Sequence, residues 1–164
     1  MIIMASNMRT MPERVYVDSS VVSGLFDNND HPERVKPFWD AVFDSRIRVV
    51  LSDVLENEIR DAPQHVQDFY DSIPKSQIEQ VVSTDESDAL AKQYVLAGIV
   101  TENSLDDCRH VALASVVRVD VLVSFNCTHI VKLNRIHKFN AIDMLLGYPQ
   151  IEIRTPDEVI YDET

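Results

Sequence analysis

Several features that mark common protein classes are missing from this sequence of 164 residues. Glycine occurs only three times, so flexible linkers are scarce. The two cysteines, Cys108 and Cys127, cannot build a disulfide framework and lack zinc-ligand spacing, which favours a reducing, cytoplasmic setting. No apolar run approaches the roughly 18 residues of a membrane helix, and residues 1–15 lack the apolar core of a signal peptide. We therefore expect no membrane segment.

Basic residues are also scarce, with 15 Lys and Arg against 27 Asp and Glu and a net charge of −12. Because nucleic acids are bound largely through Lys and Arg, this balance counts against a protein that holds them by charge alone. It suits a protein that binds cations or a basic partner. The apolar fraction of 45% is ordinary for a globular chain. We expect a flexible tail over residues 1–12 and a single domain over residues 13–164.

Short β-prone runs alternate with helical patterns along the chain. The strands are expected at residues 15–17, 47–51, 78–82, 119–125 and 151–154. The helices are expected at about 19–26, 33–45, 53–61, 63–72, 84–98, 103–117, 127–137 and 140–146, with a loop at 27–32 and a closing helical turn at 155–158. This alternation predicts a three-layer α/β/α domain with a central parallel sheet. Ligands bind such sheets at the carboxyl ends of the strands.

Two acidic residues are expected to lie at this ligand-binding edge of the sheet, where the strands end. Asp18 directly follows the first strand, although an N-cap role for the next helix would also explain it. Glu58 falls within the apolar stripe of its helix, where a carboxylate is costly unless it is paired or metal-bound. A salt bridge to Arg or Lys is the alternative for Glu58. Glu56 lies on the far side of that helix, three residues after Asp53, and a capping box explains it.

A third acid, an amide and two histidines complete the set of candidates. Asp107 borders an apolar stripe, with a capping role beside Ser104 as the alternative, whereas pairing with Arg109 explains Asp106. Asn126 follows the long apolar strand, where a turn or N-cap role is also open. The two histidines, His110 and His129, are either ligands or phosphate contacts, or structural residues. Three carboxylates and an amide suit Mg²⁺ or Mn²⁺, and phosphodiester hydrolysis uses such ions to activate water.

The chain resembles the PIN domain, a family of metal-dependent nucleases that includes the toxins of bacterial VapBC toxin–antitoxin pairs. The segments that carry the resemblance are VYVDSSVVSGLFD at 15–27, LSDVLENEIRDAP at 51–63, DDCRHVALA at 106–114, VDVLVSFNCTHIVK at 119–132 and IRTPDEVI at 153–160. This resemblance implies a PIN-like fold, cleavage of single-stranded RNA, an antitoxin partner and a homodimer.

The resemblance also implies roles for individual residues. Asp18, Glu58 and Asp107 match the metal-binding acids, and Ser20 matches a small hydroxyl residue near the metal. Asn126 stands where many members have a fourth acid, and Ser-Phe-Asn-Cys-Thr-His, which includes His129, resembles a variant branch of the family. The neutral Asn126 should weaken a second metal site.

Two other functions stay open at this stage. The charge of −12 and the neutral Asn126 would also fit a PIN-like binding or scaffold module without turnover. A basic groove near the acidic crevice would favour the nuclease, and an unbroken acidic surface would favour the module. A phosphatase is disfavoured because Ser20 replaces the second acid that usually follows the nucleophile, and the chain has neither a G-x-S-x-G elbow nor a P-loop.

Overall fold

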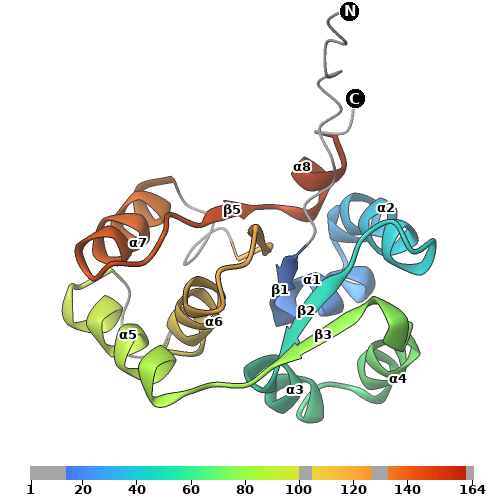
Figure 1. Ribbon diagram of the computed structural model, residues 1–164. Helices are drawn as coiled ribbons and strands as arrows, with labels where there is room; N and C mark the ends of the chain where they lie inside the picture. Colours follow the sequence, from blue (N-terminus) through green and yellow to red (C-terminus); the bar gives the residue numbers. More distant parts are fainter. Residues whose placement is uncertain (1–13, 100–104, 127–132, 162–164) are drawn as a thin grey trace, which may run out of the picture.

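The computed structural model describes residues 14–99, 105–126 and 133–161. Five parallel strands form one sheet in the order β3-β2-β1-β4-β5 (Figure 1). The strands are β1 (Val15–Val17), β2 (Val49–Ser52), β3 (Ile78–Val81), β4 (Val121–Val123) and β5 (Glu152–Arg154). The predicted α/β class with a central parallel sheet is confirmed.

Helices cover both faces of the sheet, because successive strand side chains point to opposite sides. Val15 and Val17 enter one buried cluster, whereas Tyr16 enters the other. The first cluster is built mainly with α1 (Ser19–Ser23), α2 (His31–Phe43), α3 (Asp53–Arg60), α4 (Gln64–Ser72) and α8 (Pro156–Tyr161). The second is built mainly with α5 (Asp85–Leu96), α6 (Leu105–Val116) and α7 (Leu133–Leu145). Two short 3₁₀ turns, η1 (Gly24–Phe26) and η2 (Lys75–Gln77), complete the elements. None of the helices in the described part of the chain is long and apolar enough to cross a membrane.

The strand order reverses at β1. The chain first places β2 and β3 on one side of β1, and then returns to place β4 and β5 on the other side. Val17 and Val123 pair at the last position of β1 and β4. The residues that follow them, Asp18 and Ser124, therefore lie together at the carboxyl edge. Ligands bind at this kind of reversal in open α/β sheets.

Several predicted boundaries were wrong for local reasons. The predicted loop at 27–32 is shorter because α2 begins at His31, with a proline in its first turn, where a missing N–H costs nothing. The strand predicted at 119–125 pairs only over Val121–Val123. The helix predicted at 19–26 ends at Ser23 and tightens into η1.

The two helices predicted at 127–137 and 140–146 are one helix, α7, where the structure describes them. The helix continues through Phe139, which is fully buried and meets the ring of Tyr94 edge-on at 4.9 Å. The predicted helix start at 127–132 and the tail at 1–12 lie outside the described residues.

Candidate active site

Asp18 lies at the carboxyl end of β1 and is only 3% exposed. One carboxylate oxygen, Oδ1, accepts hydrogen bonds from the backbone N–H of Ser20 at 3.1 Å and from its hydroxyl at 2.5 Å. The other oxygen, Oδ2, accepts from the Ser124 hydroxyl at 2.5 Å. Asp18 thus caps α1, as the alternative interpretation proposed. It is also held by Ser124, the residue that follows β4, on the other side of the point where the strand order reverses.

The negative charge of buried Asp18 is only partly compensated by the groups around it. Burial raises the pKa of its carboxyl, and the charge of Glu58 raises it further. The charge of His110 and the two serine hydroxyls lower this pKa, but the net direction is upward. A nearby cation would therefore favour the ionised form.

Glu58 approaches the same place from α3. Its Oε2 accepts a hydrogen bond from the Ser19 hydroxyl at 2.9 Å, and its Oε1 pairs with Nε2 of His110. The side chain is 29% exposed. Burial would raise the pKa of Glu58, but the hydrogen bond and charge of His110 and the Ser19 hydroxyl outweigh it and lower this pKa. The alternative interpretation predicted a salt bridge from Glu58 to Arg or Lys. Glu58 is paired, but with His110, so the predicted partner was wrong.

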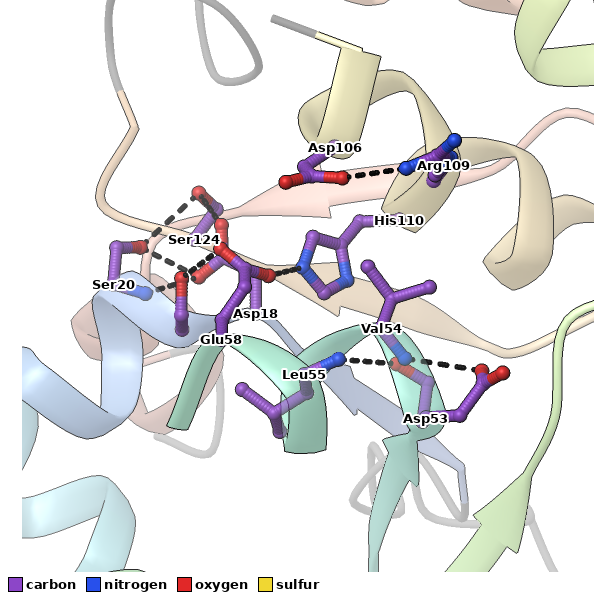
Figure 2. A network of polar contacts seen from close by, with 12 residues as sticks. Asp18, Ser20, Asp53, Val54, Leu55, Glu58, Asp106, Arg109, His110 and Ser124 are labelled. Atoms are coloured by element: carbon purple, nitrogen blue, oxygen red, sulfur yellow. Dashed lines mark hydrogen bonds and ion pairs between the residues drawn. The ribbon is translucent and has the colours of Figure 1, made fainter. Parts of the chain in front are cut away.

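His110 connects the acids to the interior. It is 1% exposed, and its Nδ1 lies 2.7 Å from the Tyr16 hydroxyl, which in turn bonds Ser52 at 2.8 Å. Burial would lower the pKa of His110, but its hydrogen bond to Glu58 and the surrounding carboxylates raise it. Figure 2 shows Asp18, Glu58 and His110 turned toward one another.

The other candidates are placed less directly. Asp107 is half-buried in the first turn of α6, and its charge contributes to the raised pKa of His110. Asn126 is half-buried, and its backbone N–H donates to Ser124 Oγ at 2.9 Å. Asp106 pairs with Arg109 at 2.9 Å, as predicted. His129 lies outside the described residues.

The oxygen donors of the cluster meet part of the needs of a hard divalent ion. Asp18 and Glu58 supply carboxylate oxygens, which Mg²⁺ and Mn²⁺ prefer, and the raised pKa of Asp18 marks a charge that such an ion would balance. Over residues 14–99, 105–126 and 133–161, however, no three His, Cys, Asp or Glu side chains are grouped as a ready metal site. The donor chemistry therefore fits, with two acids brought together and Asp107 not joined to them as a third ligand.

The surroundings of this centre differ in charge from side to side. A pocket of 420 Å³ opens beside Glu58, with Arg109 as the one cation among its described lining residues. Its carboxylates come from α3 and the residue that caps its C-terminus, and from α5 and α6: Asp53, Glu58, Asp61, Asp88 and Asp106. Beyond β4, by contrast, His31 stacks on Phe125 at 4.1 Å and the Arg34 guanidinium lies 5.1 Å from the same ring. Both of these groups are paired with carboxylates, His31 with Asp27 at 2.8 Å and Arg34 with Asp157 at 3.1 Å. The pocket side of the centre is thus acidic, and the Phe125 side carries basic groups whose charge is balanced by acids.

Sequence reasoning missed Ser19, Ser124 and Tyr16 as parts of this cluster. Ser124 could have been found by the rule that selected Asp18, since it also follows a strand that ends at the switch point. Tyr16 carries a hydroxyl in an otherwise apolar strand. Ser19 gave no signal beyond its position next to Asp18.

Comparison with known proteins places the fold. No protein-family model and no curated protein sequence matches the chain. Among solved structures, VapC20 of Mycobacterium tuberculosis, a toxin that cleaves the sarcin–ricin loop, aligns with a TM-score of 0.55 and 14% identity, covering 70% of this chain and 92% of that one. VapBC2 from Rickettsia felis, bound to a DNA fragment from its promoter, aligns with the same TM-score and identity and covers 87% and 98%. At this identity the likeness concerns the fold, which is PIN-like.

Proposed function

Starting from the PIN-like fold, we propose that this protein is a Mg²⁺- or Mn²⁺-dependent endoribonuclease that hydrolyses phosphodiester bonds of single-stranded RNA. The observation that carries the proposal is the meeting of Asp18 and Glu58 at the switch point of the sheet. Two carboxylates at the position where such sheets bind ligands are suited to a divalent ion.

In this proposal, Asp18 and Glu58 hold the cation, and Asp107, whose charge already acts on His110, would move in as the third ligand when the ion binds. When bound, it would lower the pKa of an attacking water and stabilise the charge that develops on the phosphate. The serine hydroxyls of Ser20 and Ser124 fix the orientation of Asp18. Asn126, tied to Ser124 through its backbone, would orient the water. His129 and Ser20 are proposed to contact the substrate or support the ligands.

The partners follow from the same proposal. An acidic pocket repels phosphate until a cation balances its charge, so RNA binding would depend on the divalent ion. His31 and Arg34 on the Phe125 side are already paired with Asp27 and Asp157, so they add little net positive charge. The similar structures, one a toxin that cleaves the sarcin–ricin loop and one a VapBC2 complex, support a role as the toxin of a toxin–antitoxin pair. We extend the proposal to an antitoxin partner, a homodimer, a cytoplasmic location and the variant branch with Asn126.

The direct test is a divalent-ion titration of RNA cleavage by the pure protein. Wild type should cleave a single-stranded RNA with Mg²⁺ or Mn²⁺ and stop in chelator. Glu58→Gln should lose cleavage. The matched control is Glu56→Gln on the same helix, where Glu56 faces Arg60 at 3.8 Å; it should cleave as wild type does. Cleavage that persists in chelator, or that survives in Glu58→Gln, would contradict the proposal.

A second candidate is a PIN-like binding module without turnover. The acidic lining of the pocket beside Glu58 favours it, because five carboxylates suit a basic partner better than a phosphate. A wild-type protein that shows no cleavage with either ion, but binds a lysine- and arginine-rich peptide in a salt-sensitive way, would favour this candidate.

A further inference from the structure

His110 is a fully buried histidine with both ring nitrogens engaged. Nδ1 contacts the Tyr16 hydroxyl at 2.7 Å, and Nε2 contacts Glu58 Oε1. We propose that His110 and Tyr16 are positioning residues that orient the Glu58 carboxylate for a divalent cation. This inference rests on the proposed function and assigns neither residue a direct contact with the ion.

The chain of hydrogen bonds links four elements of the fold. Tyr16 comes from β1 and bonds Ser52 at the end of β2, whose hydroxyl also accepts the N–H of Leu55 and so caps α3. His110 comes from α6 and reaches Glu58 further along α3. The helix that carries Glu58 is therefore fixed both at its N-cap and at the carboxylate itself.

The chemistry of the contact sets the orientation of Glu58. An ionised carboxylate only accepts hydrogen bonds, so His110 Nε2 carries the proton that is directed at Oε1. The Ser19 hydroxyl donates to Oε2. Each carboxylate oxygen has a second lone pair, so both oxygens keep acceptor capacity for a cation while the plane of the group is held in place.

A second buried hydrogen-bond network, around Asp143, has no exposed end in the described part of the chain and serves as a structural comparison. Tyr94 and Ser115 donate to Asp143, which is 0% exposed. That chain ends inside the protein. The chain from Tyr16 and His110 ends instead on Glu58, which is 29% exposed and lines the 420 Å³ pocket. Its endpoint is thus accessible to a ligand, which is the feature expected of support for a binding group.

The experiment compares four variants: His110→Leu, His110→Gln, Tyr16→Phe and the matched control Tyr94→Phe. Mn²⁺ affinity is measured by the EPR signal of the free ion, without RNA, and kcat and KM for RNA cleavage are measured separately. Loss of groups that support metal ligands typically costs about 10- to 100-fold in affinity or activity. We expect a loss of that size for His110→Leu in Mn²⁺ affinity and kcat, and a smaller loss for Tyr16→Phe.

The rescue and the control distinguish positioning from folding. His110→Gln restores an N–H donor toward Glu58 and should recover Mn²⁺ affinity relative to His110→Leu. Tyr94→Phe removes a buried hydroxyl of the same kind and should leave Mn²⁺ affinity and kcat at wild-type values. If His110→Leu does not fold, Tyr16→Phe and His110→Gln carry the test.

The outcomes separate this inference from the proposed function. If Glu58→Gln loses Mn²⁺ affinity but Tyr16→Phe and the folded His110 variants bind as wild type does, the positioning inference is overturned and the nuclease proposal stands. If wild type neither binds Mn²⁺ nor cleaves RNA, the proposed function fails, and this inference fails with it.

Discussion

Asp18→Asn should make the protein more stable when no divalent ion is present. Asp18 is 3% exposed, and burial raises the pKa of its carboxyl despite the opposing effects of His110, Ser124 and Ser20. A raised pKa means that folding favours the neutral form. Asparagine is neutral, has nearly the same shape, and is as good an N-cap as aspartate. The substitution therefore removes a costly charge while it keeps the cap on α1.

The size of the gain is the difference between two larger effects. Asp18 accepts three hydrogen bonds. In asparagine the remaining oxygen keeps the two from Ser20, weakened by the loss of charge, whereas the NH2 group replaces Oδ2 and the Ser124 hydroxyl must turn to accept from it. At about 1 kcal/mol for each of the three bonds, the loss is about 3 kcal/mol in all. Burying an ion costs several kcal/mol. Since the net pKa shift is upward, the second effect is larger, and we expect a gain of about 1 kcal/mol. That corresponds to a rise of about 2–4 °C in Tm for a domain of this size.

The assay is thermal unfolding of both proteins in chelator at several pH values. A raised pKa gives a contribution to stability that is complete below the ordinary value of 3.8 and is lost as pH rises through the folded value. The advantage of Asp18→Asn should thus be small near pH 4 and grow toward pH 7. A variant that melts below wild type in chelator at pH 7 would refute the reasoning.

Adding Mn²⁺ should reverse the order of the two melting curves. Wild type should gain about 2.7 kcal/mol at a free-ion concentration of 100 times Kd, and Asp18→Asn should gain little. Asp143→Asn is a matched control, because Asp143 is also a buried acid with a raised pKa but lies in the Tyr94 network. This control should keep the wild-type response to Mn²⁺.

Three further results are expected. Ser124→Ala removes the hydroxyl that Asp18 accepts and should cost about 1–3 kcal/mol in urea unfolding and abolish RNA cleavage; full activity would contradict its role. Gly24→Ala places a Cβ 3.1 Å from two ring carbons of Phe125. The Phe125 ring is held by stacking on His31 at 4.1 Å and by Arg34 at 5.1 Å, so it cannot easily give way, and overpacking should cost about 1 kcal/mol in urea unfolding; an unchanged urea midpoint would contradict this packing. His110 should make the free energy of unfolding fall as pH rises above 6.5, the ordinary pKa of histidine. Burial lowers the pKa of His110, but the paired carboxylates raise it by more, so its contribution to stability is complete below pH 6.5 and is lost as pH rises through the folded pKa. Urea midpoints measured from pH 6 to 9 would show this fall, and a flat profile would exclude it.

Much of the fold could be predicted because its determinants are local. The apolar run around Val121–Val123 reads as a strand covered on both faces, and helices between strands predict parallel pairing. The continuity of α7 could not be predicted in this way. It depends on Phe139 packing against Tyr94, which is 45 residues away in sequence, and no local pattern reports that contact.

In the candidate site, too, the residues could be predicted from the sequence but their partners could not. Asp18 was selected by its place after a strand and Glu58 by its place within an apolar stripe, and the structure places both in one polar cluster. The pairing of Glu58 with His110 joins residues 52 positions apart. Periodicity marks a residue as inward-facing but does not say which group it meets, so the partner of Glu58 needed the three-dimensional structure.

The most direct test of the central claim is a crystal of the protein soaked in MnCl₂ and measured for anomalous scattering. The account predicts an anomalous peak within coordination distance of carboxylate oxygens of Asp18 and Glu58, at the carboxyl end of β1. A crystal that shows no peak there, at a Mn²⁺ concentration at which the same preparation cleaves RNA, would contradict it.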